Sequence, residues 1–365
     1  MDGGTEHFEE VTPDIAEAKR KDQGYDECDV WVEGHEGSRN WKACTKNPGH
    51  IGFTPASQFS PDLLPKPYNE DPDVIELVRL QIELTVRLRV HYTSNARPDG
   101  YSLSKFKGQH IPHTGSGIVF VAVYKCPPPP PENENYKGCP CQFCDSAEPR
   151  APRKPEWWSI GVRTAKHVSF DTDETKTAIA DLDLDFPGQM VSKIQLHGLY
   201  SATSHLEGDI ARIYFATHDD AIGQRLKMAS KRFDDLSASM LMKYRDPERF
   251  PMYTIICSHP HGCSKQVSVG PRTGRLIVNY KVENDQPDEE WTEHTYTTPT
   301  CEGSSGAPIV LLGREKISGR HWHMISHVHR QALPSGEGHS GMTLECFVNT
   351  DLPIDSKAQS RPLPI

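Results

Sequence analysis

Short apolar runs separated by polar, turn-forming segments recur over most of the chain. In several of them apolar and polar residues alternate, which is typical of a β-strand with one buried face. The runs fall at residues 114–124, 157–162, 191–199, 210–215, 253–258, 275–281, 307–312, 323–327 and 343–348. Many short strands joined by turns predict a mostly β protein built from barrels.

Two stretches carry a different pattern. Asp71-Pro72-Asp73 places acidic residues and proline where a helix would begin, and apolar residues then recur through residues 74–92. The second half of that stretch alternates strictly from Leu80 to Val90, as in a strand, whereas its content of Glu, Gln, Arg and Leu favours a helix. Residues 222–244 predict a second helix near the middle of the β-rich part.

Three regions lack a regular pattern. Residues 1–70 are acidic and contain Gly and Pro, so we expect a largely irregular N-terminal region, followed by a helical (or strand) extension over residues 71–105. A run of consecutive prolines and a Cys-rich segment mark residues 126–155 as an insertion without regular structure. Residues 351–365 form a polar, Pro-containing tail.

Composition narrows the class of protein. Charged residues make up 25% of the 365 residues and the net charge is −10, which argues against nucleic acid as a partner. No apolar run is long enough to predict a membrane span, and the polar, acidic start lacks the apolar stretch of a secretory signal. We therefore expect a cytoplasmic protein, in which the 10 cysteines are free or bind metal.

The most informative segment for chemistry is Thr300–Val310, where Ser305 lies between glycines just ahead of an apolar strand. Small neighbours allow a substrate carbonyl to approach a serine hydroxyl. Glycines allow the backbone N–H groups of Gly303 and Ser305 to turn toward an oxygen that becomes negative. This loop therefore predicts a nucleophile and an oxyanion hole.

A serine hydroxyl needs a base, and the base needs an acceptor that orients it. His167 ends a strand-like segment, and Asp209 opens another one, 42 residues later (209 − 167). Ser305 follows Asp209 by 96 residues (305 − 209). His167 is the predicted general base, and Asp209 is the predicted partner that holds its tautomer and stabilises the imidazolium.

These motifs resemble those of the chymotrypsin/trypsin-like serine peptidase group. Thr164-Ala165-Lys166-His167 matches the end of its histidine motif, Asp209-Ile210-Ala211 its aspartate motif, and Gly303–Pro308 its serine motif. The resemblance spans roughly residues 113–350 and depends on the joint order and spacing of the three motifs.

The resemblance implies a mostly β fold with two six-stranded antiparallel β-barrels. The peptidase domain would cover residues 106–350, with barrel one at about 113–220 and barrel two at about 250–350. It further implies a serine endopeptidase that hydrolyses peptide bonds of a protein or peptide through an acyl-enzyme, and that needs no cofactor for catalysis.

The same resemblance bears on specificity and activation. Pro299 stands where enzymes that prefer Lys or Arg carry an aspartate, so that preference is not expected. Glutamyl peptidases of the group use a threonine and a histidine at places comparable to Thr300 and His329, with His327 as an alternative for the histidine. Ser304 replaces the aspartate that pairs with a new N-terminus in secreted zymogens, so we expect no activation of that kind.

Cysteine spacing suggests a second kind of site. Cys126, Cys139, Cys141 and Cys144 could supply four thiolates to a structural zinc, which would order the Pro-rich insertion. Free thiols and disulfides remain the alternatives.

Two rival functions follow from these patterns. One is a catalytically inactive peptidase-like module that binds protein. The other is a zinc-dependent interaction protein built around the Cys-rich insertion. The sequence leaves the oligomeric state open.

Overall fold

Six antiparallel strands from residues 85–217 close into a ring, barrel one, in the computed structural model. The strands pair in the order β4, β3, β6, β7, β8, β5, and β5 pairs again with β4. The members are β3 (Thr85–Val90), β4 (His113–Lys125), β5 (Trp157–Thr164), β6 (Ala178–Leu182), β7 (Ile194–His205) and β8 (Ile210–Thr217).

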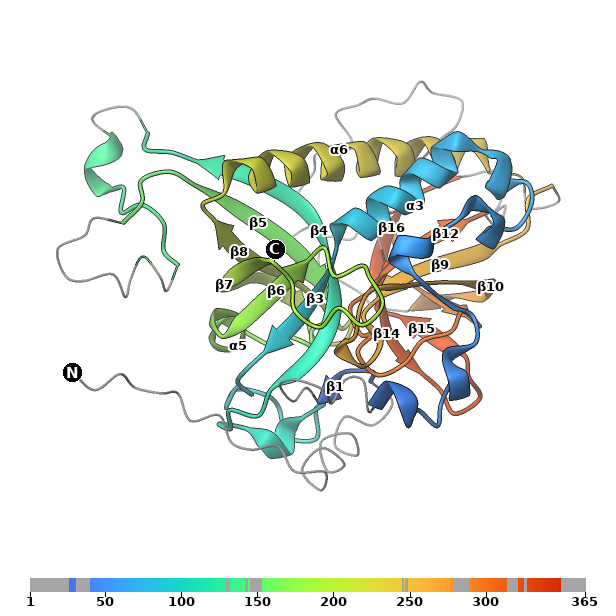
Figure 1. Ribbon diagram of the computed structural model, residues 1–365, viewed down its shortest axis with the longest axis horizontal. Helices are drawn as coiled ribbons and strands as arrows, with labels where there is room; N and C mark the ends of the chain where they lie inside the picture. The colour runs from blue at the N-terminus through green and yellow to red at the C-terminus, as the bar shows by residue number, and fades with distance from the viewer. Residues whose placement is uncertain are drawn as a thin grey trace.

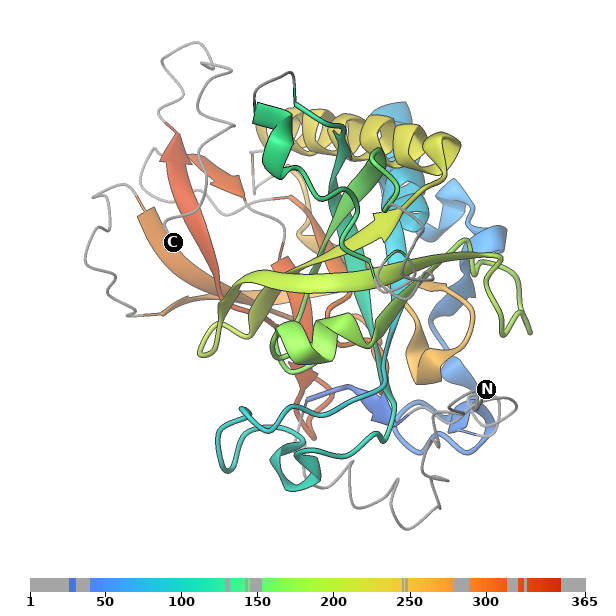
Figure 2. The same ribbon diagram turned by 90° about the vertical axis from the view of Figure 1, so that its left-hand side faces the viewer.

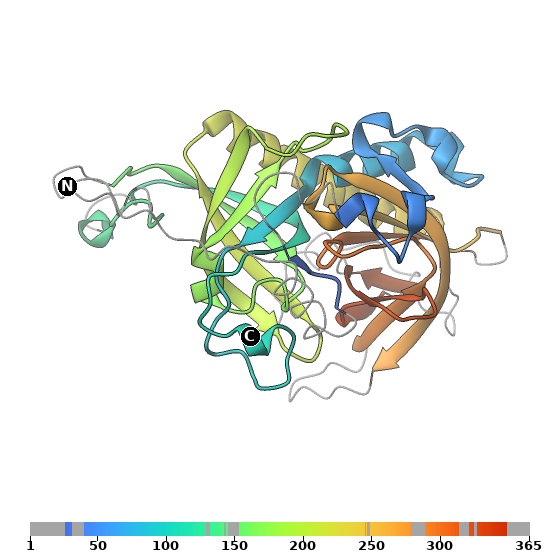
Figure 3. The same cartoon turned by 60° about the horizontal axis from the view of Figure 1, so that its bottom comes forward.

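Six further antiparallel strands form a second ring, barrel two. They pair in the order β11, β15, β14, β12, β9, β10, and β10 closes the ring by pairing with β11. The members are β9 (Tyr253–Ser258), β10 (Gln266–Val278), β11 (Glu289–Tyr296), β12 (Pro308–Leu312), β14 (His327–Ala332) and β15 (Gly338–Ser340). Figure 3 shows the green and yellow barrel one beside the orange and red barrel two.

Four strands extend these rings. In barrel two, β16 pairs with β11, β13 with β16, and β2 with β10, whereas β1 pairs with β4 of barrel one. Their bounds are β1 (Asp29–Val30), β2 (Phe53–Pro55), β13 (His321–Met324) and β16 (Thr343–Val348). Two closed six-stranded antiparallel barrels confirm the predicted mostly β, two-barrel fold.

The structure describes most of the chain. The described residues are 26–30, 40–128, 132–141, 144, 153–244, 246, 249–278, 289–313, 321–324 and 327–348. Part of the expected irregular N-terminal region (residues 1–70), part of the 126–155 insertion and the expected tail at 351–365 lie outside the described residues. Within these described ranges, no helix combines the length and the apolar character needed to cross a bilayer.

The stretch at residues 74–92, whose pattern fits a helix or a strand, forms a helix followed by a strand. Helix α3 (Pro72–Leu84) begins at Asp71, whose carboxylate accepts from the Asp73 N–H at 3.0 Å. The chain then becomes extended at Thr85, and every residue of β3 is buried. Barrel one thus begins at Thr85, and the expected start near residue 113 was wrong. The alternation of β3 follows directly on a helix, and its polar residues Arg87 and Arg89 are buried against Asp181, a partner distant in the sequence.

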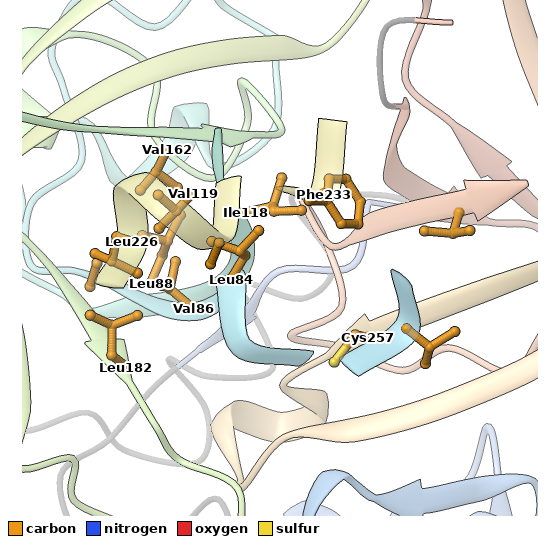
Figure 4. Packing of buried hydrophobic residues seen from close by; sticks show 14 of the residues in the cluster. Leu84, Val86, Leu88, Ile118, Val119, Val162, Leu182, Leu226, Phe233 and Cys257 are labelled. Atoms are coloured by element: carbon orange, nitrogen blue, oxygen red, sulfur yellow. The ribbon is translucent and has the colours of Figure 1, made fainter. Parts of the chain in front are cut away.

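Helix α6 (Asp220–Lys243) lies along both barrels with α3 beside it, and α5 (Thr172–Lys176) is a short helix after β5 (Figures 1 and 2). The predicted helix at 222–244 is confirmed. Leu226 and Phe233 of α6 join Leu84 and the barrel side chains in one buried apolar cluster, which includes Cys257 of barrel two (Figure 4). This continuous core couples the two barrels.

Residues 40–70 lie on barrel two, in the blue part of Figure 3, where β2 adds an edge strand to β10. They contain short 3-10 turns, among them η1 (Pro48–His50). In this part of the N-terminal region, the expected irregular sequence is folded onto the second barrel.

Gly223 in α6 is the basis of a stability prediction. A Cβ there would lie 2.1 Å from the Trp158 ring, so we expect Gly223→Ala to lower the free energy of unfolding by about 1–3 kcal/mol. At an open helical position the same change raises it by about 1 kcal/mol. Chemical unfolding followed by far-UV circular dichroism measures the sign. Ser239→Ala, on an exposed position of the same helix, is the control, and an equally or more stable Gly223→Ala protein would contradict the packing.

Candidate active site

The loop after β5 holds the predicted base in a buried position. The backbone N–H of His167 donates to Asp209 Oδ1 at 2.9 Å. Its carbonyl accepts from the Arg97 guanidinium at 2.9 Å, and Arg97 is itself paired with Glu174 at 2.6 and 2.8 Å. All four side chains are buried, so the backbone that carries the imidazole is fixed from both sides.

His167, Asp209 and Ser305 converge, as the sequence predicts. His167 Nδ1 lies 2.6 Å from Asp209 Oδ2, and His167 Nε2 lies 2.6 Å from Ser305 Oγ. Tyr101 donates its hydroxyl to Asp209 Oδ1 at 3.2 Å. A carboxylate at Nδ1 favours the tautomer with hydrogen at Nδ1, which leaves Nε2 free to accept the serine proton.

The electrostatics favour the charged form of His167, the form it takes after it accepts the serine proton. Burial disfavours a charged imidazole, but the carboxylates of Asp209 and Asp26 outweigh that effect and raise the pKa of His167 well above its usual value. Burial also disfavours the Asp209 carboxylate, yet His167 and Arg330 keep the pKa of Asp209 below its usual value. The pair is therefore built to stabilise an imidazolium beside a carboxylate.

Ser116 of β4 connects the serine loop to barrel one. Its N–H donates to the Ser305 carbonyl at 2.7 Å, and its hydroxyl donates to the Gly303 carbonyl at 2.8 Å. The hydroxyl also accepts from the His259 N–H at 2.9 Å. These bonds link barrel one to the loops of barrel two on which the serine depends.

The two N–H groups predicted to form an oxyanion hole point at one oxygen atom. Gly303 has φ +93°, and a Cβ there would lie 2.5 Å from the His259 carbonyl oxygen, so only glycine fits. The N–H groups of Gly303 and Ser305 both donate to the carbonyl oxygen of Glu27, at 2.6 and 3.2 Å. Ser304 accepts from the Cys301 N–H at 3.2 Å and lies 3.2 Å from the Ser258 hydroxyl, so this loop is ordered by internal hydrogen bonds.

An extended segment of the chain itself, residues 26–30, occupies the site. β1 pairs with β4, and Asp26 forms an antiparallel bridge with Gln331 of β14. Glu27 is buried, and its N–H donates to Ser305 Oγ at 2.9 Å. Sequence reasoning missed this segment, because no local pattern in an acidic N-terminal region shows where it docks.

The carboxylate of Glu27 lies among the residues predicted to set specificity. Its Oε2 is 2.6 Å from His329 Nε2, and its Oε1 pairs with Lys46, which also lies 3.3 Å from the Thr300 hydroxyl. Tyr296 lies 2.5 Å from His329 Nδ1. His329 thus contacts the Glu27 carboxylate directly and Thr300 lies next to it through Lys46, a residue that the sequence did not indicate.

His329 is held in one protonation state. Burial and the nearby Lys46 charge lower the pKa of His329 well below its usual value, so the ring is neutral. With the Tyr296 hydroxyl donating to Nδ1, the hydrogen is on Nε2 and points at the Glu27 carboxylate. The alternative histidine, His327, instead lies 3.1 Å from the Ser340 hydroxyl and 3.2 Å from the Gly341 carbonyl.

Three of the four expected metal-binding thiols converge. Donor atoms of Cys139, Cys141, Cys144 and His218 all lie within 4.8 Å of one another. Cys126 is exposed and lies outside this group, contrary to the expected grouping, and His218 lies beside the three thiols instead. The reason is topological: His218 follows β8, and strand pairing brings it beside the insertion in a way that sequence spacing does not reveal. Thiolates and an imidazole suit zinc.

The sequence matches no protein-family model and no curated protein. Solved structures with a similar fold include the active form of the Rv3671c protease from M. tuberculosis, at 10% identity and a TM-score of 0.36, covering 74% of this chain and 82% of that one. The HtrA-type protease AlgWS227A with tripeptide is 11% identical, with a TM-score of 0.34, and the match covers 76% of this chain and 60% of that one. At such scores function must be argued from the site.

Proposed function

We propose that this protein is a serine endopeptidase that acts through His167, Asp209 and Ser305. The observation that carries the proposal is the hydrogen-bonded chain of these three side chains next to two N–H groups that already hold a peptide carbonyl. This arrangement supports the proposal because acyl transfer requires a nucleophile, a base within reach, an orienting carboxylate and an oxyanion hole.

The chemistry follows from these positions. Ser305 Oγ attacks the scissile carbonyl while His167 Nε2 takes the hydroxyl proton. The N–H groups of Gly303 and Ser305 stabilise the oxyanion, and His167 returns the proton to the leaving amine. Water then hydrolyses the acyl-enzyme by the same proton transfers in reverse order.

The residues around the Glu27 carboxylate define the proposed specificity. A side chain that follows the path of Glu27 meets the His329 Nε2–H and the Lys46 ammonium, with Thr300 adjacent. Two donors at a buried position favour a carboxylate over an uncharged side chain. We therefore expect cleavage after glutamate.

A fluorophosphonate label distinguishes this enzyme from an inactive peptidase-like module, because only an activated serine reacts. We expect labelling of the full-length protein and faster labelling of Glu27→Ala, which loses the anchor of the segment that covers Ser305. Ser305→Ala and His167→Ala should not be labelled, although circular dichroism should show them folded. Absence of label from both the wild type and Glu27→Ala would favour the binding module.

The pH dependence of specificity tests the role of Lys46. Burial lowers the pKa of Lys46 to about 8, so the ammonium is present below that pH and lost above it. The ratio of kcat/KM for paired peptides with Glu or Gln before the scissile bond should fall roughly tenfold above about pH 8, as a charge-assisted hydrogen bond is lost. Lys46→Met should abolish this fall of the Glu/Gln ratio above about pH 8, whereas Lys42→Met, at an exposed position of the same segment, should retain it. A ratio that favours Gln at every pH would contradict the proposed specificity.

A further inference from the structure

Two cysteines and two histidines from distant parts of the sequence converge beside the serine loop. Cys44 and His50 come from the N-terminal region, His261 from the turn η7 (Pro260–Gly262), and Cys301 from the loop that leads to Ser305. One donor atom of each lies within 4.8 Å of the others, and the two sulfurs are 3.7 Å apart. We call these four residues the Cys44 cluster.

The histidines of the Cys44 cluster are buried beside the Cys44 thiol. His50 is 5% exposed and His261 is 4% exposed. Both rings interact with Cys44, yet among the described residues neither ring nitrogen of His50 and not Nε2 of His261 has a hydrogen bond of good geometry. Buried nitrogens that meet only a thiol are poorly satisfied, as expected where a metal ion would lie between them.

Backbone geometry supports the same conclusion. His50 has φ 49° and His261 has φ 54°, both in the left-handed region that residues other than glycine rarely adopt. Trp41 stacks on the His50 ring with centroids 3.6 Å apart, which holds that ring in place. Strained backbone at two buried histidines that face each other is typical of a binding site.

We propose that the Cys44 cluster binds a structural zinc ion. Two thiolates and two imidazoles are a donor set that zinc prefers in tetrahedral sites. His261 Nδ1 lies 3.2 Å from Asp29 Oδ2, so Nε2 is left for the metal in a carboxylate–histidine–metal arrangement. Asn47 donates its backbone N–H to Cys44 Sγ at 3.4 Å and its amide to Cys301 Sγ at 3.0 Å, bonds that stabilise thiolates.

This zinc would order the catalytic site without touching substrate. Cys301 lies in the same loop as Gly303 and Ser305, and Cys44 is two positions from Lys46, which contacts Glu27 (46 − 44). The ion would therefore hold both the oxyanion loop and the carboxylate-binding lysine. The ion would thereby order the loop of Gly303 and Ser305. In secreted enzymes of the resembling group, an aspartate at the place of Ser304 does this by pairing with a new N-terminus.

Zinc content per chain, measured on full-length Ser305→Ala protein purified under reducing conditions, tests the Cys44 cluster. We expect Cys44→Ser and His50→Gln each to lower the zinc content by one equivalent, whatever the cluster at Cys139, Cys141, Cys144 and His218 contributes. Cys263→Ser, a buried cysteine outside the group, is the matched control and should change nothing.

Cobalt absorption gives a second readout, which reports the ligands and geometry of the bound metal. Cobalt-loaded parent protein should show the visible absorption of tetrahedral coordination with thiolate ligands. Cys44→Ser should lose the part of this absorption that comes from the Cys44 cluster, and Cys139→Ser should keep that part. Unchanged zinc content in a folded Cys44→Ser protein would overturn the proposal. A Cys44–Cys301 disulfide found by mass spectrometry of the parent would do so as well.

The course of residues 26–30 supports a second inference, which rests on the proposed function. We infer that the chain cleaves its own Glu27–Cys28 bond. The carbonyl of Glu27 occupies the oxyanion hole, its carboxylate meets His329 and Lys46, and the following residues pair with β4. This is how a substrate with glutamate before the scissile bond would lie.

The reaction balances with groups already in place. Ser305 Oγ forms an ester with the Glu27 carbonyl carbon, the bond to the Cys28 nitrogen breaks, and His167 passes the serine proton to that nitrogen. Water hydrolyses the ester and leaves a carboxylate on Glu27. Release of residues 1–27 would then uncover Ser305, which is fully buried while Glu27 lies over it.

Intact mass spectrometry over time tests self-cleavage. We expect the wild type to yield a chain that begins at Cys28, with a rate independent of protein concentration, and Ser305→Ala to stay whole. Glu27→Gln, which keeps the shape and loses the charge, should react at least roughly tenfold more slowly, as expected for a lost charge-assisted bond. A wild type that labels with fluorophosphonate and cleaves glutamyl peptides, yet keeps the Glu27–Cys28 bond, would overturn self-cleavage alone. Absence of both activities would overturn the endopeptidase as well.

Discussion

The hydrogen bonds of Ser116 are the interaction on which the rest of the site depends. His167 and Asp209 belong to barrel one and Ser305 belongs to barrel two, so the catalytic distances exist only if the barrels keep one relative position. Ser116 provides that link through the carbonyls of Gly303 and Ser305 and the N–H of His259. Close approach requires small neighbours, since a Cβ at Gly115 would lie 2.9 Å from the Ser305 carbonyl oxygen. The apolar core under α6 also stabilises the packing of the two barrels, but the directional hydrogen bonds fix their relative position.

The N-terminal region completes the site in two ways. Its residues Lys46, Cys44 and His50 lie against barrel two, where they meet Thr300, Cys301 and His261. Its residues Asp26 and Glu27 fill the catalytic centre, and Asp29 contacts His261. Binding of the segment, the proposed zinc and the carboxylate-binding residues therefore share contacts, so a change in one alters the energetics of the others.

Sequence reasoning succeeded where a requirement is local. The strands at 157–162 and 343–348 follow from apolar patterns, and the catalytic residues lie in short motifs whose glycines and flanking strands are needed by the chemistry itself. It failed where a partner is distant. The start of barrel one was wrong because the arginines of β3 are buried against Asp181, more than 90 positions away. Cys126 lies apart from the other three thiols of the insertion because strand pairing, and not spacing along the insertion, brings His218 to them.

From the sequence alone, the order of His167, Asp209 and Ser305 and their neighbouring residues predicted the fold class and the reaction to be tested. This was possible because the glycines that a serine loop needs and the side chains that react lie within short segments of the sequence. Only the tertiary structure decided that the Glu27 carbonyl meets the N–H groups of Gly303 and Ser305, that His329 contacts the Glu27 carboxylate, and that Cys44 meets Cys301. Each of these contacts joins residues more than 250 positions apart. Such pairs form when whole barrels pack, and no periodicity along the chain records them.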